Sequence, residues 1–160
     1  MYKRQSPAKG LCIYADSRSI IWIGTIKDGL FKYNRTYDDF HKETIVSEYK
    51  VNDLEDIASI AEDEYNRLWI GYNYGLAIYD YNDHLFRNYA FETNHNSLQN
   101  VAITSIYRTK SHNMVIGSYF SGLFYIKELN STKKFYTLTD AKDNIGGVTS
   151  NGLSLIHISE

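Results

Sequence analysis

The amino-acid sequence predicts an all-β fold in which one four-stranded unit is repeated along the chain. The 160 residues include 15 Tyr and 7 Phe but only one Pro, and aromatic side chains fit the pleated, half-buried surface of a sheet. One short frame occurs three times: a large apolar residue, then Ile-Gly, and four or five residues later Gly-Leu. No segment shows a 3.6-residue periodicity long enough for a helix.

The repeat has a period of 46 or 47 residues, and several separate landmarks keep this spacing. Ile13, Ile60 and Ile106 mark the first apolar run of the three copies. The landmarks of the central part are Trp22, Gly24 and Gly29, then Trp69, Gly71 and Gly75, and finally Val115, Gly117 and Gly122. A register that holds at so many positions predicts structural units in series rather than a repeated active site.

Each copy contains four short apolar runs bounded by polar or Gly-containing turns. In the first copy the expected strands lie near residues 10–15, 20–25, 29–34 and 40–45. Four strands in about 47 residues are typical of one blade of a β-propeller. The fold class is therefore a β-propeller fragment with three four-stranded blades and the start of a fourth. The expected blades are residues 10–50, 56–98 and 101–140, with residues 141–160 as a partial fourth blade or a non-native tail.

The repeated residues have structural explanations. The Gly that ends each second strand stands where a side chain would crowd a neighbouring backbone, and the Gly that opens each third strand needs a positive φ. Asp16 and Asp63 are expected to close the turn between the first two strands through a hydrogen bond from backbone to side chain. Trp22 and Trp69 are expected to fill the space between adjacent blades.

The segment "IASIAEDEYNRLWIGYNYGLAIYDYNDHLF" at residues 57–86 resembles the two-component regulator propeller repeat. The resemblance covers most of residues 10–138, with a weaker fourth start at residues 150–160. The third copy departs from the pattern, since Val115 replaces Trp and Thr109 replaces the turn Asp, and this indicates a degenerate blade. The final "SLIHISE", residues 154–160, also resembles translated sequencing-adapter sequence, so it is either a non-native tail or a native first strand.

Members of this family are typically periplasmic sensor regions of hybrid histidine kinases, and they commonly sense oligosaccharides. The resemblance therefore implies a ligand-sensing segment of a two-component receptor on the periplasmic side of a membrane. It also implies two kinds of partner, namely the remaining blades of a longer chain and a second copy in a homodimer. A propeller enzyme that degrades polysaccharides and a protein-interaction scaffold are the alternatives.

The sequence shows no catalytic constellation, no cofactor motif and no metal-ligand spacing, so neither enzyme chemistry nor a cofactor is expected in this segment. The five His lack the H-x-H and H-E-x-x-H patterns, and the acidic residues 53–64 lack the spacing of an EF-hand loop. A net charge of −2 with 17 scattered basic residues argues against nucleic-acid binding. Neither a membrane span nor a signal-peptide core is found, and the lone Cys12 is expected to be a small buried hydrophobe.

The loops between the second and third strands are the candidate binding surface, because loops carry binding more often than the scaffold beneath them. These loops are residues 25–28, 72–74 and 118–121, and they vary while the flanking frame is kept. Aromatic rings stack on sugars or fill protein interfaces. The candidate ligand-binding residues are Tyr72, Asn73, Tyr74, Ser118, Tyr119 and Phe120. Asp28 is the only acidic residue in these loops, which argues against glycoside hydrolysis by a carboxylate pair.

Overall fold

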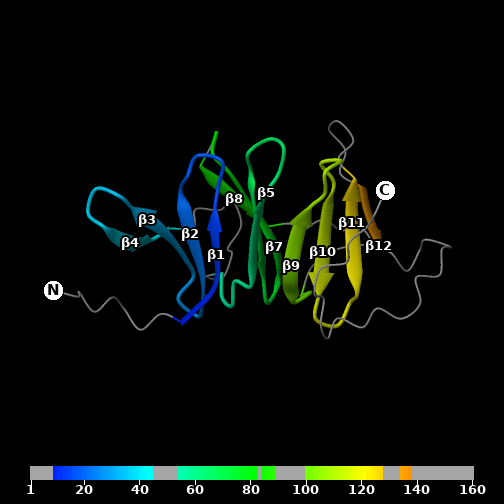
Figure 1. The fold of residues 1–160 in the computed structure, drawn as a ribbon. Coiled ribbons are helices and arrows are strands. Elements are labelled where there is room, and N and C mark those ends of the chain that lie inside the picture. Colours follow the sequence, from blue (N-terminus) through cyan, green and yellow to red (C-terminus); the bar gives the residue numbers. More distant parts are fainter. Residues whose placement is uncertain (1–8, 45–53, 83, 89–99, 128–133, 138–160) are drawn as a thin grey trace.

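The described part of the chain forms three antiparallel four-stranded sheets (Figure 1). The structure is a computed structural model and describes residues 9–44, 54–82, 84–88, 100–127 and 134–137. The first sheet contains β1 (Lys9–Ala15), β2 (Ile21–Ile26), β3 (Leu30–Asn34) and β4 (Asp39–Lys42). The second contains β5 (Ser59–Glu62), β6 (Leu68–Tyr72), β7 (Gly75–Asp80) and β8 (Leu85–Asn88). The third contains β9 (Ile103–Arg108), β10 (Met114–Ser118), β11 (Leu123–Lys127) and β12 (Lys134–Thr137).

The strand order confirms the all-β propeller fold. In each sheet the four strands pair in chain order, β1-β2-β3-β4 and so on, as expected for a blade made of one repeat. No helix occurs in the described residues, and the segments expected to be equivalent first strands are indeed strands β1, β5 and β9. The expected start of a fourth blade, residues 141–160, lies outside the described residues.

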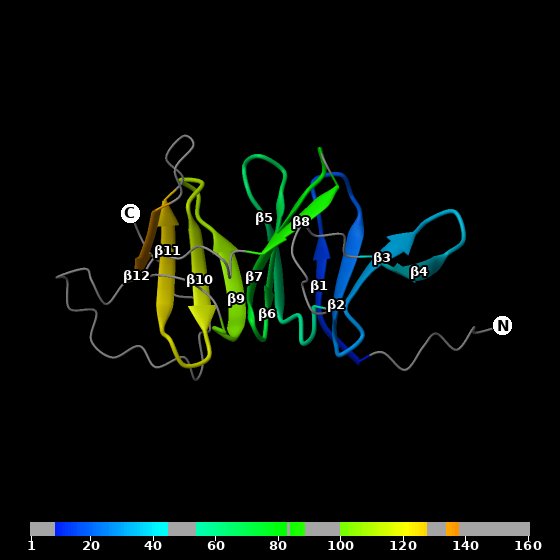
Figure 2. The same cartoon turned by 180° about the vertical axis from the view of Figure 1, so that it is seen from behind.

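The sheets stand in series, face against face, with the first strands β1, β5 and β9 next to one another (Figures 1 and 2). One buried cluster lies between the first two sheets and includes Trp22 and Leu30 from the first and Ile70 from the second. A second cluster includes Trp69 and Met114 and lies between the second and third sheets. Trp22 and Trp69 are both fully buried, which confirms that they fill the space between blades.

A buried carboxylate holds each Trp in place. Asp16 Oδ1 accepts hydrogen bonds from the backbone N–H groups of Arg18 and Ile20, at 3.0 and 2.7 Å, and closes the β1–β2 turn. The other carboxylate oxygen of Asp16 accepts the indole N–H of Trp22 at 2.9 Å. The predicted turn role of this Asp is confirmed, and the bond to the indole is an additional role that the sequence pattern did not reveal.

The repeated glycines serve two different purposes. A Cβ added to Gly24 or Gly71 would lie 2.4 Å from a methyl carbon, that of Ile57 or Ile103 respectively, at the start of the next blade. The predicted crowding against a backbone is found at Gly24, next to the Ile57 carbonyl, where the Ile57 and Cys12 side chains are also close. At Gly71 the crowding comes instead from side chains, those of Ile103 and Ile106. The Gly that opens each third strand has a positive φ, as expected; these residues are Gly29, Gly75 and Gly122.

Candidate ligand-binding rim

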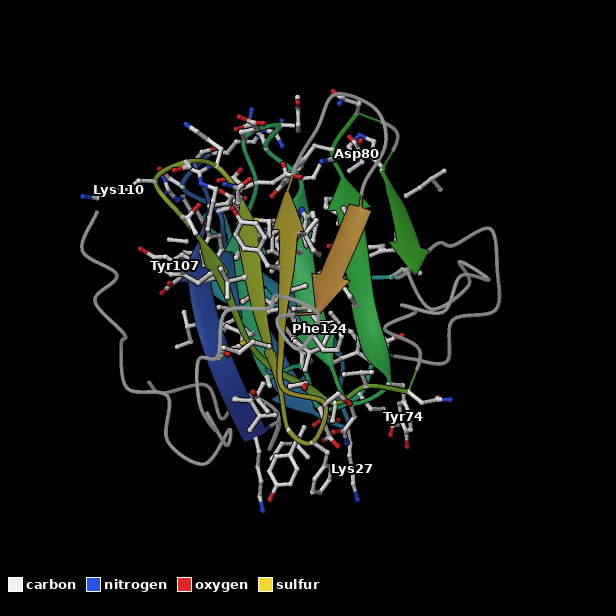
Figure 3. All side chains as sticks on the ribbon, turned by 90° about the vertical axis from the view of Figure 1, so that its right-hand side faces the viewer. Lys27, Tyr74, Asp80, Tyr107, Lys110 and Phe124 are labelled. Carbon is white, nitrogen blue, oxygen red and sulfur yellow. The ribbon has the colours of Figure 1, made fainter. Side chains whose placement is uncertain are left out.

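The loops between second and third strands all lie at one end of the blades, where Lys27 and Tyr74 are labelled in Figure 3. The entry segment of the third blade contacts two of these loops, that of the second blade and its own. Asn100 N donates to the Tyr74 carbonyl at 3.0 Å, and Tyr119 N donates to the Ala102 carbonyl at 2.8 Å. The candidate loops are thus held by short backbone hydrogen bonds rather than projecting freely.

Four of the six candidate residues are exposed on this rim. Tyr74 is 54% exposed, Tyr119 53% and Phe120 90%. The rings of Tyr119 and Phe120 meet edge to face with centroids 4.4 Å apart, an arrangement that keeps one ring in place beside the other. Asn73 is exposed too, and its side-chain amide donates to Asp56 Oδ2 at 2.5 Å. The rim therefore combines flat apolar rings with amide and carboxylate groups.

Tyr72 and Ser118 are not on the rim surface, contrary to the expectation of exposed loop residues. Tyr72 is the last residue of β6, is 3% exposed and belongs to the cluster between the first two sheets. Ser118 is the last residue of β10 and is fully buried. Its hydroxyl donates to the Gly122 carbonyl at 2.8 Å and accepts from Ser121 N at 2.9 Å. Both side chains are therefore buried beneath the rim rather than exposed on it.

A shallow hollow of about 210 Å³ lies against the adjacent first strands, away from the predicted loops. Its lining includes Tyr14 of β1, Glu62 of β5 and Arg108 of β9. The Glu62 carboxylate accepts two hydrogen bonds from Ser17, from the backbone N–H at 2.8 Å and from the hydroxyl at 2.9 Å. Burial and then the negative charge of Glu62 raise the pKa of Tyr14, so its phenol stays neutral. The sequence did not predict this hollow because its lining residues come from three separate repeats.

The described residues contain no group of three or more His, Cys, Asp or Glu placed to hold a metal ion. Among the same residues, no helix is long and apolar enough to cross a membrane. Cys12 is half-buried rather than fully buried, and its thiol donates to the Ile57 carbonyl at 3.5 Å. Burial raises the pKa of this thiol, which keeps it protonated and poorly nucleophilic.

Solved structures with the same fold include bacterial extracellular domains. A domain assigned to a hybrid two-component system of B. thetaiotaomicron is 24% identical, with a TM-score of 0.64 over 87% of this chain and 18% of its own. A domain assigned to a one-component system of the same organism is 23% identical, with a TM-score of 0.60 over 82% of this chain and 17% of its own.

A catalytically inactive virginiamycin B lyase from Staphylococcus aureus is also similar, with 11% identity and a TM-score of 0.58. That match covers 85% of this chain and 43% of the lyase. No protein-family model and no curated protein matches the sequence. At these identities the matches establish the fold, a set of propeller blades. The chain spans less than a fifth of the length of the two extracellular domains.

Proposed function

We propose that this chain is part of an extracytoplasmic ligand-sensing domain of a two-component receptor, and that it binds oligosaccharide at the rim. The fold it shares with extracellular domains assigned to signalling systems of B. thetaiotaomicron supports the sensing role. The observation that carries the proposal is the presence of Tyr74, Tyr119 and Phe120 as exposed rings on one rim of a rigid scaffold.

The chemistry of this rim suits sugars. The C–H face of a pyranose packs on an aromatic ring, while its hydroxyls need directed hydrogen-bond partners. Phe120 and Tyr119 supply adjacent ring surfaces, and the phenol of Tyr119 adds a polar group. The Asn73–Asp56 pair supplies a donor and an acceptor that are already oriented by their mutual hydrogen bond. Such a site binds a sugar without cleaving it, as a sensor requires.

Binding of the 160-residue chain to an array of plant and host oligosaccharides tests the proposal. For any sugar bound, Phe120→Ala is expected to weaken binding by about tenfold, the loss of roughly 1.4 kcal/mol of ring contact. Tyr37→Ala is the matched control, because Tyr37 is 71% exposed but lies between β3 and β4, away from the rim loops. If both substitutions weakened sugar binding equally, or if neither weakened it, the rim would be ruled out as the sugar site.

The same experiment separates the sensor from a propeller enzyme that degrades polysaccharides. An enzyme would release shorter products from the bound oligosaccharide, because a carboxylate pair facing one pocket would cleave the glycosidic bond. A sensor is expected to return the oligosaccharide unchanged after prolonged incubation. Chromatography of the recovered sugar distinguishes the two results.

A further inference from the structure

The hollow against the first strands lies inside the series of sheets rather than at either end of it. Tyr14 of β1 packs against the cluster between the first and second sheets. Glu62 of β5 faces the first blade, where Ser17 donates two hydrogen bonds to its carboxylate. Arg108 stands two residues after Ile106, and alternation along β9 places both on the side of the second sheet. The polar groups of the hollow therefore stand at two interfaces that are complete within the described residues.

The hollow opens toward the centre of the propeller. Neighbouring sheets converge at their first strands, since β1 contacts β5 and β5 contacts β9. In Figure 3, which looks along the series, β1 (blue) and Tyr107 of β9 lie at the same margin of the molecule. Propeller blades surround a central channel, so the strands at which the blades converge border that channel. A further blade would pack on the outer face of the first or third sheet and would leave this margin open.

A small side chain in the middle blade accounts for the hollow. Tyr14, Ala61 and Tyr107 hold the same repeat position, so Ala stands between two blades that carry Tyr. Ala61 lines the hollow together with the buried side chains of Ile60 and Ile106, which gives it an apolar base. Its volume of about 210 Å³ is below the roughly 300–1,000 Å³ of pockets that enclose drug-sized ligands. The space therefore suits a single-ring molecule.

Arg108 is the group in this hollow that is free to bind a ligand. Its side chain is exposed, and within the described part of the chain no hydrogen bond or ion pair engages the guanidinium. The guanidinium groups of Arg18, Arg35 and Arg67, in contrast, contact a Tyr ring, a carbonyl and a carboxylate respectively. A guanidinium presents paired N–H donors that match both oxygens of a carboxylate. Arg108 therefore indicates an anionic ligand.

The other polar groups of the hollow restrict the charge of that ligand. The Glu62 carboxylate brings a negative charge to the same hollow, which disfavours a dianion such as a phosphate monoester. Ser17 occupies two of the roughly four acceptor positions of this carboxylate, so Glu62 can still accept a ligand hydroxyl. The Tyr14 phenol is neutral, because burial and the charge of Glu62 raise its pKa, and it adds no second negative charge. These groups favour a monoanion with hydroxyl groups and an apolar face.

We propose that the hollow binds a single-ring carboxylate, with the carboxylate on the Arg108 guanidinium and one face of the ring on the apolar base. A sugar acid supplies this chemistry in full, because its ring C–H groups form an apolar face and a ring hydroxyl can donate to Glu62. The hollow lies against the first strands, away from the loops of the rim. The inference therefore does not rest on the proposed rim site.

Isothermal titration calorimetry of the 160-residue chain with sodium glucuronate tests the proposal. Glucose is the matched neutral ligand, since it has the same ring with a hydroxymethyl group in place of the carboxylate. Glucuronate is expected to bind at least about tenfold more tightly than glucose. Arg108→Gln should weaken glucuronate binding by about tenfold or more, because the side chain loses its charge and its paired donors. Lys110→Gln is the control and should change binding by less than about twofold, since Lys110 is an exposed cation nearby that does not line the hollow (Figure 3).

Two further arms locate the ligand and identify its class. Phe120→Ala should leave glucuronate binding unchanged, whereas a loss in this variant would place the ligand at the rim and overturn the proposal. Phenylacetate, an aromatic carboxylate, is expected to bind more weakly than glucuronate because it offers no hydroxyl to Glu62. Tighter binding of phenylacetate that is lost in Arg108→Gln would support the carboxylate site and assign it an aromatic acid.

Three results would contradict the carboxylate site itself. These are failure of both carboxylates to bind, binding of glucose as tight as that of glucuronate, and equal losses in Arg108→Gln and Lys110→Gln. The last result would mean that the ligand responds to the general positive charge of this margin rather than to one guanidinium. Circular dichroism checks that each variant keeps its sheets.

Discussion

At the scale of single residues, a buried carboxylate follows the first strand of the first and of the second blade and makes several hydrogen bonds. Asp63 is fully buried, and its Oδ1 accepts the backbone N–H groups of Tyr65 and Arg67, each at 2.9 Å. Its Oδ2 accepts the indole N–H of Trp69 at 2.8 Å and the guanidinium of Arg67 at 2.7 and 2.6 Å. One side chain therefore connects the turn, the ion pair and the interface Trp.

Replacing Asp63 by Ala should destabilise the chain by about 3–5 kcal/mol, because the partly buried Arg67 and the indole of Trp69 would lose their acceptor. Urea unfolding measures this difference. Asp80→Ala is the matched control, since the Asp80 carboxylate accepts the Asn82 N–H at the β7–β8 turn. That control should cost about 1 kcal/mol. Equal losses for the two variants would contradict the central role of Asp63.

The surroundings of Tyr81 indicate that the free energy of unfolding depends on pH in the alkaline range. Its phenol donates to the Asp16 carboxylate and lies under the guanidinium of Arg18, whose carbon is 3.7 Å from the ring centroid. Burial, and then the hydrogen bond and charge of Asp16, raise the pKa of Tyr81 well above its usual value. An unfolded Tyr loses its proton near pH 10, so above that pH the unfolded chain is deprotonated first. The free energy of unfolding must then fall as the pH rises.

Tyr81→Phe should remove this contribution. The variant loses the hydrogen bond to Asp16 at neutral pH, at a cost of about 1.5–3 kcal/mol for a charged acceptor. Between about pH 9 and about pH 11, however, its stability should decline less steeply than that of the native chain. Urea midpoints at a series of pH values measure both effects. Parallel declines would show that the phenol of Tyr81 does not titrate differently in the folded chain.

At the scale of elements, the second strand of the first and of the second blade carries a Gly near its end because the next blade begins with an Ile against it. Gly71→Ala would place a Cβ 2.4 Å from the Ile103 methyl carbon and 3.2 Å from Ile106. Overpacking of this kind typically costs about 1–3 kcal/mol. In Gly10→Ala the new Cβ would only touch Ile23 at 3.6 Å, so this control should change stability by less than about 0.5 kcal/mol. A thermal melt of both variants provides the comparison.

The sequence predicted the elements better than it predicted their ends. A 46- or 47-residue register locates each strand, since apolar runs and Gly positions recur with it. The register does not determine whether Tyr72 and Ser118 are the last residues of a strand or the first residues of a loop. That difference decides whether their side chains are buried. The structure places both in strands. Tyr74, Tyr119 and Phe120, further along the same loops, are exposed as predicted.

At the scale of the whole molecule, the third blade shows how a departure from the repeat is accommodated. Thr109 replaces the turn Asp, and its hydroxyl still accepts the Asn113 N–H at 3.1 Å. Val115 replaces the Trp of the other blades and has no indole N–H. The third blade therefore does not need the carboxylate that accepts the indole N–H in the first two blades. The prediction of a degenerate blade within the same fold is confirmed by the four-stranded sheet that these residues form. The sequence also predicted that Trp22 and Trp69 lie between blades. It did not predict that Ile57 and Ile103 pack against the Gly residues of the preceding blade.

The last prediction concerns how strongly the blades depend on one another. Trp69 is fully buried in the cluster between the second and third sheets, and Ala substitution of a buried large aromatic typically costs about 3–5 kcal/mol. Because small domains are stable by only about 5–15 kcal/mol, Trp69→Ala should greatly lower the urea midpoint of both sheets together.

Val115→Ala is the matched control for this test, since Val115 holds the same repeat position but is only partly buried at the end of the described series. Measured at a concentration low enough to exclude association, this substitution should cost about 1 kcal/mol or less. If Trp69→Ala cost no more than Val115→Ala, the cluster between the blades would not be what holds them together. The expected large difference would instead show that the side chain buried between the second and third sheets contributes several kcal/mol to the stability of the chain.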